Sequence, residues 1–460
     1  MQISGLMTGF DAASVVDQLM AVERLGANKI KTRQTQAGAV SQALTRLNGV
    51  VKSMGDAAKA VSSQITSESI WNSAKATSSN PSAATVTARN GALAGSLTFS
   101  VESTATSGAL IGGKTFESPT TSIGGDAGQT YSFGISDGEG KQLTEVSIAG
   151  GATIEDVAKA INDQKSGVNA TVVKVNDNDY RLQLTSNKTG AVSNLTLTDG
   201  TAPNGALNLL GSMNTLYNGT DASIKVGEGA NAYSLKSSTN TFNGVLPGVD
   251  VTVLKADSGT PVTAQVTQDI DGMAAKVQAM VDAANEALSN IRINSKADLV
   301  NKGDKKADGV FVGDATTRAV TNQITNVFVG SSANLPSIAG VSIDKSGSIT
   351  FDKAKFTEAF GKDPAKVEAT LTQTAKNLEE VAKGATNATN GSIAMAIKGQ
   401  DAMVKNYTDQ INRFNERMDM KEQTLMRQYN ALDSMLSKMK SQGDWLAGQL
   451  ASLPTPNSNN

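Results

Sequence analysis

A four-three alternation of apolar residues begins at Val40 and continues to Ile65. Its members are Val40, Leu44, Leu47, Val51, Met54, Ala58, Val61 and Ile65. This spacing predicts a coiled-coil helix of about 40 Å, at ~1.5 Å rise per residue, whose narrow apolar stripe needs a partner helix. Before Val40 the same spacing meets Glu23, Gly26 and Arg33, so we expect the seam to stop there.

A second periodic row lies near the C-terminus. Every seventh residue is apolar in the series Val404, Ile411, Met418, Leu425, Leu432, Met439, Leu446 and Leu453. A companion row contains Tyr407 and Phe414, falters, and resumes one place later as Tyr429, Leu436 and Leu450, which indicates a change of partner or geometry. We expect this helix to pair with the N-terminal seam. Because it is the longer of the two, we expect part of it to pair between chains; the alternative is an internal hairpin with no outside partner.

A short amphipathic segment precedes the N-terminal seam. Val15, Leu19 and Val22 share one of its faces. Asp11 is a candidate N-cap, and Phe10 is placed to pack against Val15. Both chain ends therefore contain helix-forming stretches without an obvious partner, as is typical of segments that fold on assembly. We expect the N-terminal segment to be partly disordered until then.

The middle of the chain is rich in Thr, Ser and Gly with alternating apolar residues, which predicts antiparallel strands. Three predicted strands have inner faces formed by Leu97, Phe99 and Val101; by Tyr131, Phe133 and Ile135; and by Tyr180, Leu182 and Leu184. One helix interrupts them, capped by Thr153 with Asp156 at N3. Its packing face consists of Ile154, Val157 and Ile161.

Helical periodicity returns after residue 268. Two helices are predicted from apolar faces at Met273, Val277, Met280, Ala284 and Ile291, and at Val320, Ile324 and Val327. A third begins with Asp363 as N-cap and Pro364 at N1, and Gly384 is expected to end it. A hairpin turn is expected near Ser346 and Gly347.

A helical domain built from both chain ends, with β-rich domains inserted between them, accounts for the whole pattern. The predicted fold class is α+β multidomain, with a terminal α-helical coiled-coil leg domain and two inserted β-rich head domains. The expected boundaries are 1–39 for an N-terminal assembly segment, 40–73 and 269–403 for the leg domain, 74–108 and 219–268 for an inner β head domain, 109–218 for an outer one, and 404–460 for a C-terminal coiled-coil helix with a disordered tail.

Composition narrows the function classes. Lys and Arg total 41 against 43 Asp and Glu, so the charge balance gives no argument for a nucleic-acid or anionic-membrane partner. Cysteine and histidine are both absent, which excludes disulfides, thiol nucleophiles, Ser-His-Asp triads and most zinc sites. The N-terminus does not resemble a Sec-type signal, and no stretch is apolar enough to predict a membrane span.

Residues 108–115, GALIGGKT, match the phosphate-loop pattern G-x-x-x-x-G-K-[ST] through Gly108, Gly113, Lys114 and Thr115. Such a loop also needs a buried strand before it and a helix after it. The flanking stretches SVESTATS and FESPTTSIGG predict neither. We interpret the segment as a flexible, glycine-rich crossing between two β domains, and an ATPase is the least favoured alternative.

Two acidic turns are the remaining candidates for chemistry. Asp137 with Glu139, and Asp177 with Asp179, could be imagined as calcium ligands, but they lack the spacing of a calcium loop. We interpret both as hairpin turns. No catalytic, cofactor-binding or metal-ligating residue is therefore predicted, and we do not expect an enzyme.

Several stretches resemble the flagellar hook-associated protein 2 family, the filament cap proteins. The N-terminus is similar to the family signature at Ser4, Gly5, Gly9, Phe10, Asp11, Leu19, Met20, Glu23 and Arg24, and departs from it at Met7 and Thr8. Further similar segments contain Pro247, Gly248 and Val249; Gly313, Asp314 and Arg318; and the Asp-Pro helix start at 363–364. Residues 153–173 and 181–190 resemble an insert shared with flagellins and hook proteins.

The resemblance implies a protein exported through the flagellar type III channel to the distal tip of the extracellular filament. It implies a homo-oligomeric ring, usually a homopentamer in the family, with a plate of head domains and legs made of the terminal helices. The implied partners are flagellin, whose folding, polymerisation and retention the cap promotes, the hook-filament junction protein and an export chaperone. Host mucin would be a second, adhesive partner; neither nucleic acid nor membrane insertion is expected.

Two rival interpretations stay open. Another axial protein, either a flagellin or a hook-filament junction protein, would also pair terminal helices around an inserted head. The stretches PGVDVTV and GKDPAKVEATL favour the cap over these. A surface adhesin, from a different class, would use the same β-rich head.

Overall fold

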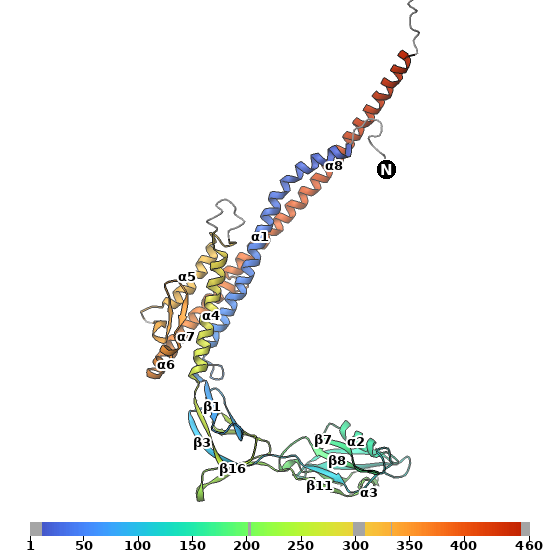
Figure 1. Ribbon diagram of the computed structural model, residues 1–460, viewed down its shortest axis with the longest axis vertical. Coiled ribbons are helices and arrows are strands. Elements are labelled where there is room, and N and C mark those ends of the chain that lie inside the picture. The colour runs from blue at the N-terminus through green and yellow to red at the C-terminus, as the bar shows by residue number, and fades with distance from the viewer. Residues whose placement is uncertain (1–11, 201–203, 298–308, 333, 452–460) are drawn as a thin grey trace, which may run out of the picture. The chain divides into compact units, whose positions relative to one another are not determined.

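The computed structural model describes residues 12–200, 204–297, 309–332 and 334–451 (Figure 1). The chain divides into two compact units. One contains the chain up to Ser62 and from Ala274 onward, and the other contains Ser63–Met273. The first unit is helical and the second is β-rich, so the fold is α+β, as the sequence predicted.

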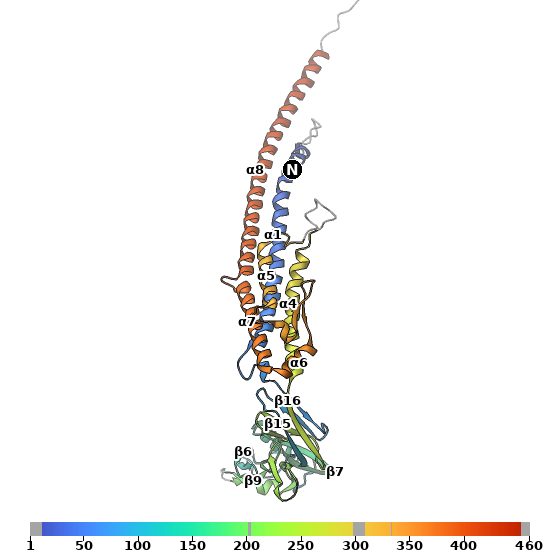
Figure 2. The same ribbon diagram turned by 90° about the vertical axis from the view of Figure 1, so that its left-hand side faces the viewer.

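The helical unit is built from long helices and one small hairpin. The described elements are α1 (Ala12–Ser62), α4 (Ile270–Asn294), α5 (Ala315–Val329), a 3-10 turn (Pro336–Ala339), β17 (Val341–Ile343), β18 (Ile349–Phe351), α6 (Lys353–Lys362), α7 (Pro364–Thr386) and α8 (Ser392–Ala451). α1 lies beside α8 along one stretch and beside α7 along another, in both views (Figures 1 and 2). Segments from opposite ends of the chain thus share one core.

Helix starts in this unit follow the predicted capping chemistry. The Asp363 side chain accepts a hydrogen bond from the Lys366 amide, and Pro364 occupies the first turn, as expected. α7 continues past Gly384 to Thr386, so the predicted stop at that glycine is wrong. The hairpin turn is confirmed, because Gly347 has a φ of +77° between β17 and β18.

α1 is one continuous helix that passes through the predicted boundary between residues 39 and 40, and that boundary stays a prediction. Gly26 and Arg33, which were expected to stop the seam, lie inside it. Ile65 lies beyond its end at Ser62 and is 59% exposed, so the predicted seam ends earlier than expected. Asp11 and Phe10, the expected cap and staple, lie outside the described residues.

The β-rich unit contains two hydrophobic cores. The first core lies between a five-stranded sheet, β1 (Ala74–Ser78), β16 (Asp257–Gln268), β3 (Gly95–Ser103), β12 (Ala222–Val226) and β13 (Tyr233–Ser237), and a three-stranded sheet, β14 (Thr241–Leu246), β15 (Val249–Val253) and β2 (Ala84–Ala88). Phe99 and Val101 are buried in this core, as the alternation in β3 predicted. Gly248, with a φ of +78°, forms the turn between β14 and β15.

The second core comes from residues 110–210. Its strands are β4 (Ala109–Gly112), β5 (Thr130–Ser136), β6 (Gln142–Ala149), β7 (Val168–Asn176), β8 (Asp179–Ser186), β9 (Thr196–Asp199), β10 (Asn204–Gly205) and β11 (Met213–Tyr217), with α2 (Ile154–Asp163) and α3 (Leu207–Leu210). One sheet has the order β11-β4-β8-β7; in the other, β5 pairs with β6, β9 and β10. All the pairings are antiparallel except the short β10–β5 contact.

The sequence predictions for this second core are largely confirmed. Phe133 and Ile135 of β5, and Leu182 and Leu184 of β8, are buried on the expected faces. The predicted capping box of α2 is present: the Asp156 amide donates to Thr153 Oγ1, and the Asp156 carboxylate accepts from the Thr153 amide. The assignment of the two cores to separately bounded inner and outer domains stays a prediction.

Candidate functional site

The chain ends form an antiparallel pair of helices in which α1 runs against α8. Polar contacts mark the register along it: Gln34 Nε2 donates to Thr408 Oγ1 at 2.8 Å, Ser41 Oγ donates to Asp401 Oδ1 at 2.5 Å, Arg24 Nη2 donates to Glu422 Oε2 at 2.9 Å, and Lys421 Nζ donates to Glu23 Oε1 at 2.6 Å. From Ser41 through Gln34 to Arg24, the partner in α8 moves from Asp401 through Thr408 to Glu422, so this helix pair, hereafter the end hairpin, is antiparallel.

The apolar contacts of the end hairpin use a different face of α1 from the predicted one. Val16 and Met20 are at most 1% exposed and cluster with Met418, whereas Leu19 is 42% and Val22 67% exposed. Positions 16, 23, 30, 37 and 44 keep a spacing of seven into the buried part of α1. Seven residues before Leu47 the second row of the seam would continue at Val40, but its next contact with α8 is made by Ser41, followed by Gln34. This shift by one place rotates the buried face of α1.

The seam predicted after Val40 is buried, and its last part contacts α7 instead of α8. Leu44, Leu47, Val51, Met54 and Val61 are at most 1% exposed. Val40 is half-buried. Toward the end of α1, a Cβ built on Gly55 would meet Ala382 of α7, and Ser62 Oγ donates to Glu379 Oε2 of the same helix at 3.0 Å. The expected pairing with the C-terminal row is thus wrong for this stretch, because the shorter α7 already covers it.

The C-terminal row changes environment along α8. Val404, Tyr407, Ile411, Phe414 and Leu425 are half-buried, and Met418 is 9% exposed. The row members further on, Leu432, Met439 and Leu446, are 47%, 59% and 53% exposed. Leu453 lies outside the described residues. The change coincides with the predicted shift of the companion row to Tyr429 and Leu436.

The residues of the N-terminal signature are only partly described. Ser4, Gly5, Gly9, Phe10 and Asp11 lie outside the described residues. Of the rest, Met20 packs on α8 and Leu19 points away from it. The contribution of Val16 was missed, although it starts the seven-residue row that ends at Leu44. Ala27, Gln34 and Ser41 were also missed; they continue a second seven-residue row that starts at Met20.

The segment GALIGGKT is part of a sheet rather than a flexible crossing. Ala109–Gly112 form β4, which pairs with β8 on one side and β11 on the other. A Cβ at Gly108 would lie 2.6 Å from the Ser193 carbonyl oxygen, so this glycine allows close backbone packing. The expectation of flexibility is therefore wrong.

Lys114 has a structural role in that sheet. Its Nζ donates to the carbonyl oxygens of Ile123 and Leu209 at 3.0 and 2.7 Å, and lies 5.3 Å from the centre of the Phe116 ring. The next α-helix along the chain begins only at Ile154. The helix N-terminus that a phosphate loop needs is thus missing after this lysine.

The acidic turns use their carboxylates within the protein, as predicted. Asp137 Oδ1 accepts from the amides of Glu139 and Lys141, which closes the turn between β5 and β6. Asp179 forms an ion pair with Arg181 at 2.8 Å, and Asp177 pairs with Lys174. In the described part of the chain, no three acidic side chains gather into a possible metal site.

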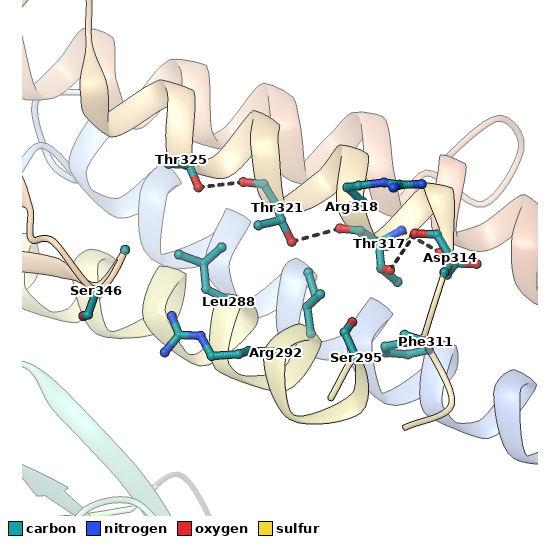
Figure 3. Close-up of a pocket in the computed structure, with 13 residues that line it drawn as sticks. Leu288, Arg292, Ser295, Phe311, Asp314, Thr317, Arg318, Thr321, Thr325 and Ser346 are labelled. Carbon is teal, nitrogen blue, oxygen red and sulfur yellow. Dashed lines mark hydrogen bonds between the residues drawn. The ribbon is translucent and has the colours of Figure 1, made fainter. Parts of the chain in front are cut away.

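A cavity of about 420 Å³ lies between α4, α5 and the β17–β18 turn (Figure 3). Part of its polar lining forms hydrogen bonds within helix α5 and its cap: the Thr317 amide donates to Asp314 Oδ1 at 2.7 Å, and the hydroxyls of Thr321 and Thr325 donate to carbonyls of the preceding turn. These groups cap and brace the helix. Asp314 caps the start of α5 and Arg318 lies in its first turn. The motif that contains them therefore marks a helix start and not a reactive pair.

None of the described helices is apolar over a stretch long enough to cross a bilayer. We therefore take the end hairpin, together with the exposed apolar row of α8 from Leu432 to Leu446, as the candidate functional surface.

Comparisons with known proteins concern both chain ends and the middle. Residues 8–108 match the model for the flagellar hook-associated protein 2 N-terminus, and residues 219–441 match that for its C-terminus. Residues 132–188 match the flagellin hook IN motif. The matched ranges include α1, most of α8 and the first β core.

Individual relatives agree with these matches. The chain is 24% identical over 463 residues to flagellar hook-associated protein 2 of Escherichia coli K12, covering 97% of each. It is 26% identical over 299 residues to the lateral flagellar hook-associated protein 2 of Vibrio parahaemolyticus, covering 63% of this chain and 66% of the relative. The crystal structure of the D1-D2-D3 domains of the Escherichia coli flagellar cap protein superposes with a TM-score of 0.60 at 23% identity, covering 78% of this chain and 99% of that one, which shows the same fold.

Proposed function

Because the chain belongs to the flagellar hook-associated protein 2 family, we propose that it is a filament cap. It forms a homo-oligomer at the distal tip of the growing bacterial flagellum. There it promotes the folding and polymerisation of flagellin and prevents its loss to the medium. The same family membership favours a cap over a flagellin, a hook-filament junction protein or an adhesin.

One observation carries the proposal: beyond the described part of α1, α8 exposes a row of large apolar side chains. Leu432, Met439 and Leu446 are each about half exposed, although they continue the row that is covered by α1 further back. An apolar row that leaves its partner helix is typical of a surface that is buried in an assembly. The row therefore supports a protein whose ends act as assembly legs.

The oligomerisation role belongs, in this proposal, to the exposed part of α8. Leu44, Leu47, Val51, Met54 and Val61 are occupied within the chain, so they serve the leg's own core. The contacts to other chains begin after Tyr429. The β-rich unit forms the head, with an inner domain at 74–108 and 219–268 and an outer one at 109–218, supported by its two separate cores.

The finer assignments follow from the same proposal. The ring is a homopentamer, the chain leaves the cell through the flagellar type III channel, and an export chaperone accompanies it. The legs contact the newest flagellin subunits, and the hook-filament junction protein receives the first cap. The absence of cysteine suits a chain that passes through a narrow channel without crosslinks.

Truncation of the exposed part of α8 tests the function. A chain ending at Ala431 keeps the four polar contacts between α1 and α8 described above, so it should fold with a normal helical circular dichroism spectrum. In cells that make this truncated chain in place of the full-length protein, we expect electron microscopy to show no filaments and flagellin to accumulate in the medium. Deletion of 404–460 should have the same effect, and removal of 452–460 alone serves as the control. Normal filaments from the folded chain ending at Ala431 would contradict the proposal.

A further inference from the structure

Two short stretches of chain connect the two cores of the β-rich unit. The first crossing is residues 104–108, between β3 and β4, and the second is residues 218–221, between β11 and β12. Ala105 belongs to the first core and Leu110 to the second, so the first crossing is very short. Cores that are joined only by such stretches normally move relative to each other. The contacts of the crossings therefore decide whether these two cores do so.

The two crossings are hydrogen-bonded to each other. The Thr106 amide donates to the Thr220 carbonyl oxygen at 3.0 Å, and the Thr220 amide donates to Thr106 Oγ1 at 3.1 Å. Ser103 Oγ, at the end of β3, donates to the Asp221 carbonyl oxygen at 3.0 Å. The crossings thus form a short two-stranded ribbon. A ribbon alone could still bend as a hinge, because a hinge needs only a few residues whose dihedral angles are free to change.

A third segment, residues 189–194 from the loop between β8 and β9, packs against both crossings. Ser193 is 1% exposed, and its Oγ accepts a hydrogen bond from the Gly108 amide at 2.8 Å. The Asn194 side chain binds both backbone groups of Gly219: Oδ1 accepts from the amide at 2.8 Å, and Nδ2 donates to the carbonyl oxygen at 3.1 Å. One side chain of this segment therefore holds each crossing.

The same segment also reaches the first core directly. Thr189 Oγ1 donates to the Ser238 carbonyl oxygen at 2.7 Å, between β13 and β14. The Ala191 amide donates to Asp221 Oδ1 at 2.8 Å, beside the start of β12. Ser238 lies outside the ribbon, so its bond attaches the second core to the first at an additional point. An attachment away from the ribbon opposes bending and twisting of the ribbon.

Glycines allow these segments to lie in close backbone contact. A Cβ atom on Gly219 would lie 2.0 Å from Ser193 Oγ. Gly190 has a φ of +90°, and a Cβ atom there would lie 2.6 Å from the Ser238 Cα. Both positions therefore exclude any side chain. Together with Gly108, they show that the junction between the cores is tightly packed as well as hydrogen-bonded.

We propose that residues 104–108, 189–194 and 218–221 form a clasp that holds the two cores as one rigid body. This inference is independent of the cap function, because it concerns only the β-rich unit. Opening the clasp as a hinge would leave backbone donors without partners, which is costly where water does not replace them. The clasp amides with a hydrogen bond are those of Thr106, Gly108, Gly190, Ala191, Gly219 and Thr220. A contact made by the second core is therefore transmitted to the first core.

Spin labels on the full-length chain test the proposal, because the natural chain contains no cysteine. Thr77→Cys in β1 and Thr171→Cys in β7 place one label at an exposed position of each core's sheets. Ser147→Cys in β6, combined with Thr171→Cys, places both labels in the second core and serves as the reference pair. We expect double electron–electron resonance to give a single cross-core distance distribution, as narrow as that of the reference pair. A broad or multiple cross-core distribution beside a narrow reference would overturn the proposal.

A substitution within the clasp tests which bonds hold the cores. Asn194→Ala removes both bonds to Gly219, so the cross-core distribution should broaden several-fold while the reference pair stays unchanged. Asn187→Ala is the matched control, because Asn187 is exposed in the same loop and its side chain forms no hydrogen bond within the described part of the chain. A cross-core distribution that Asn194→Ala leaves as narrow as before would contradict the clasp.

A milder substitution decides the case in which Asn194→Ala also broadens the reference pair and so disturbs the second core itself. Thr189→Val keeps the shape of the side chain but lacks the hydroxyl that donates to the Ser238 carbonyl oxygen. Broadening of the cross-core distribution alone would support the clasp. No broadening with this variant would then overturn it.

Discussion

Gly55 of α1 lies so close to Ala382 of α7 that a Cβ atom at Gly55 would be only 2.8 Å from the Ala382 Cβ. The two helices can approach this closely only because the residue at position 55 has no side chain. Gly49, also in α1, has no atom within 4 Å of the equivalent Cβ position. The same helix therefore contains one glycine that packing requires and one that it does not.

Alanine substitutions at these two glycines should have opposite effects. Gly49→Ala should stabilise the helical unit by roughly 0.5–1 kcal/mol, because alanine is the better helix former. Gly55→Ala gains the same propensity but should be net destabilising, since overpacking costs about 1–3 kcal/mol. Thermal unfolding followed by circular dichroism at the helical band measures both. Equal stabilisation by the two substitutions would show that α1 and α7 can separate without cost.

The hydrogen bond between Gln34 and Thr408 should contribute to the register of the end hairpin. Gln34→Ala removes a partner of a half-buried hydroxyl, so we expect a loss of about 0.5–1.5 kcal/mol. Adding Thr408→Val should cost less than the sum of the single substitutions, because either single substitution already removes the hydrogen bond that the two residues share. The Thr408 hydroxyl also donates to the Val404 carbonyl, and only Thr408→Val removes that bond. Gln36→Ala, at an exposed position, is the control and should change little. Strict additivity in this double-mutant cycle would exclude an energetic coupling between the two residues.

The sequence predicted the elements of the end hairpin better than their pairing. Periodicity depends only on each helix's own residues, so the seam at Leu44–Val61 and the row from Val404 were recognisable. Which helix packs on which row depends on the other helices that can pack there. Here α7 contacts the stretch of α1 around Gly55 and Ser62 that the longer α8 was expected to cover. The face with Val16 and Met20 was missed because Leu19 and Val22 form an equally regular stripe. That ambiguity is itself the sign of a helix with two apolar faces.

The β-rich unit was predictable where alternation was clean and misleading where glycine was frequent. The inner faces of β3, β5 and β8 follow from period two. Around Gly108 the glycines indicated flexibility, but the close Ser193 carbonyl shows that they allow tight strand packing instead. Sequence alone does not distinguish these two uses of glycine, because the difference lies in a neighbour 85 residues away.

Lys114 should stabilise the second β core rather than bind a nucleotide. Lys114→Met keeps the aliphatic stem but removes the ammonium that donates to Ile123 and Leu209, and hydrogen bonds of a charged donor contribute about 1.5–3 kcal/mol. We expect faster amide hydrogen exchange in β4 and β8, with Lys141→Met, at an exposed side chain, as the control. Titration calorimetry should detect no magnesium-dependent ATP binding in either form. ATP binding that Lys114→Met abolishes would restore the phosphate-loop interpretation.

The ion pair between Arg89 and Asp250 should make the first β core sensitive to acid. Arg89 Nη2 donates to Asp250 Oδ2 at 2.6 Å and the Gly244 amide donates to the other carboxylate oxygen, and these bonds lower the pKa of Asp250. A carboxyl whose pKa is lower in the folded state stabilises the fold above its unfolded pKa of about 3.9, and that stabilisation is lost as the pH falls through the folded pKa. Asp250→Asn should therefore destabilise the core at pH 7, and the two chains should converge only once the pH falls below the lowered folded pKa of Asp250. Hydrogen exchange of β2 and β15 amides between neutral and acidic pH measures the difference, with the exposed Glu228→Gln as control. A difference that stays constant as the pH falls through the folded pKa would show that Asp250 acts through packing rather than through its charge.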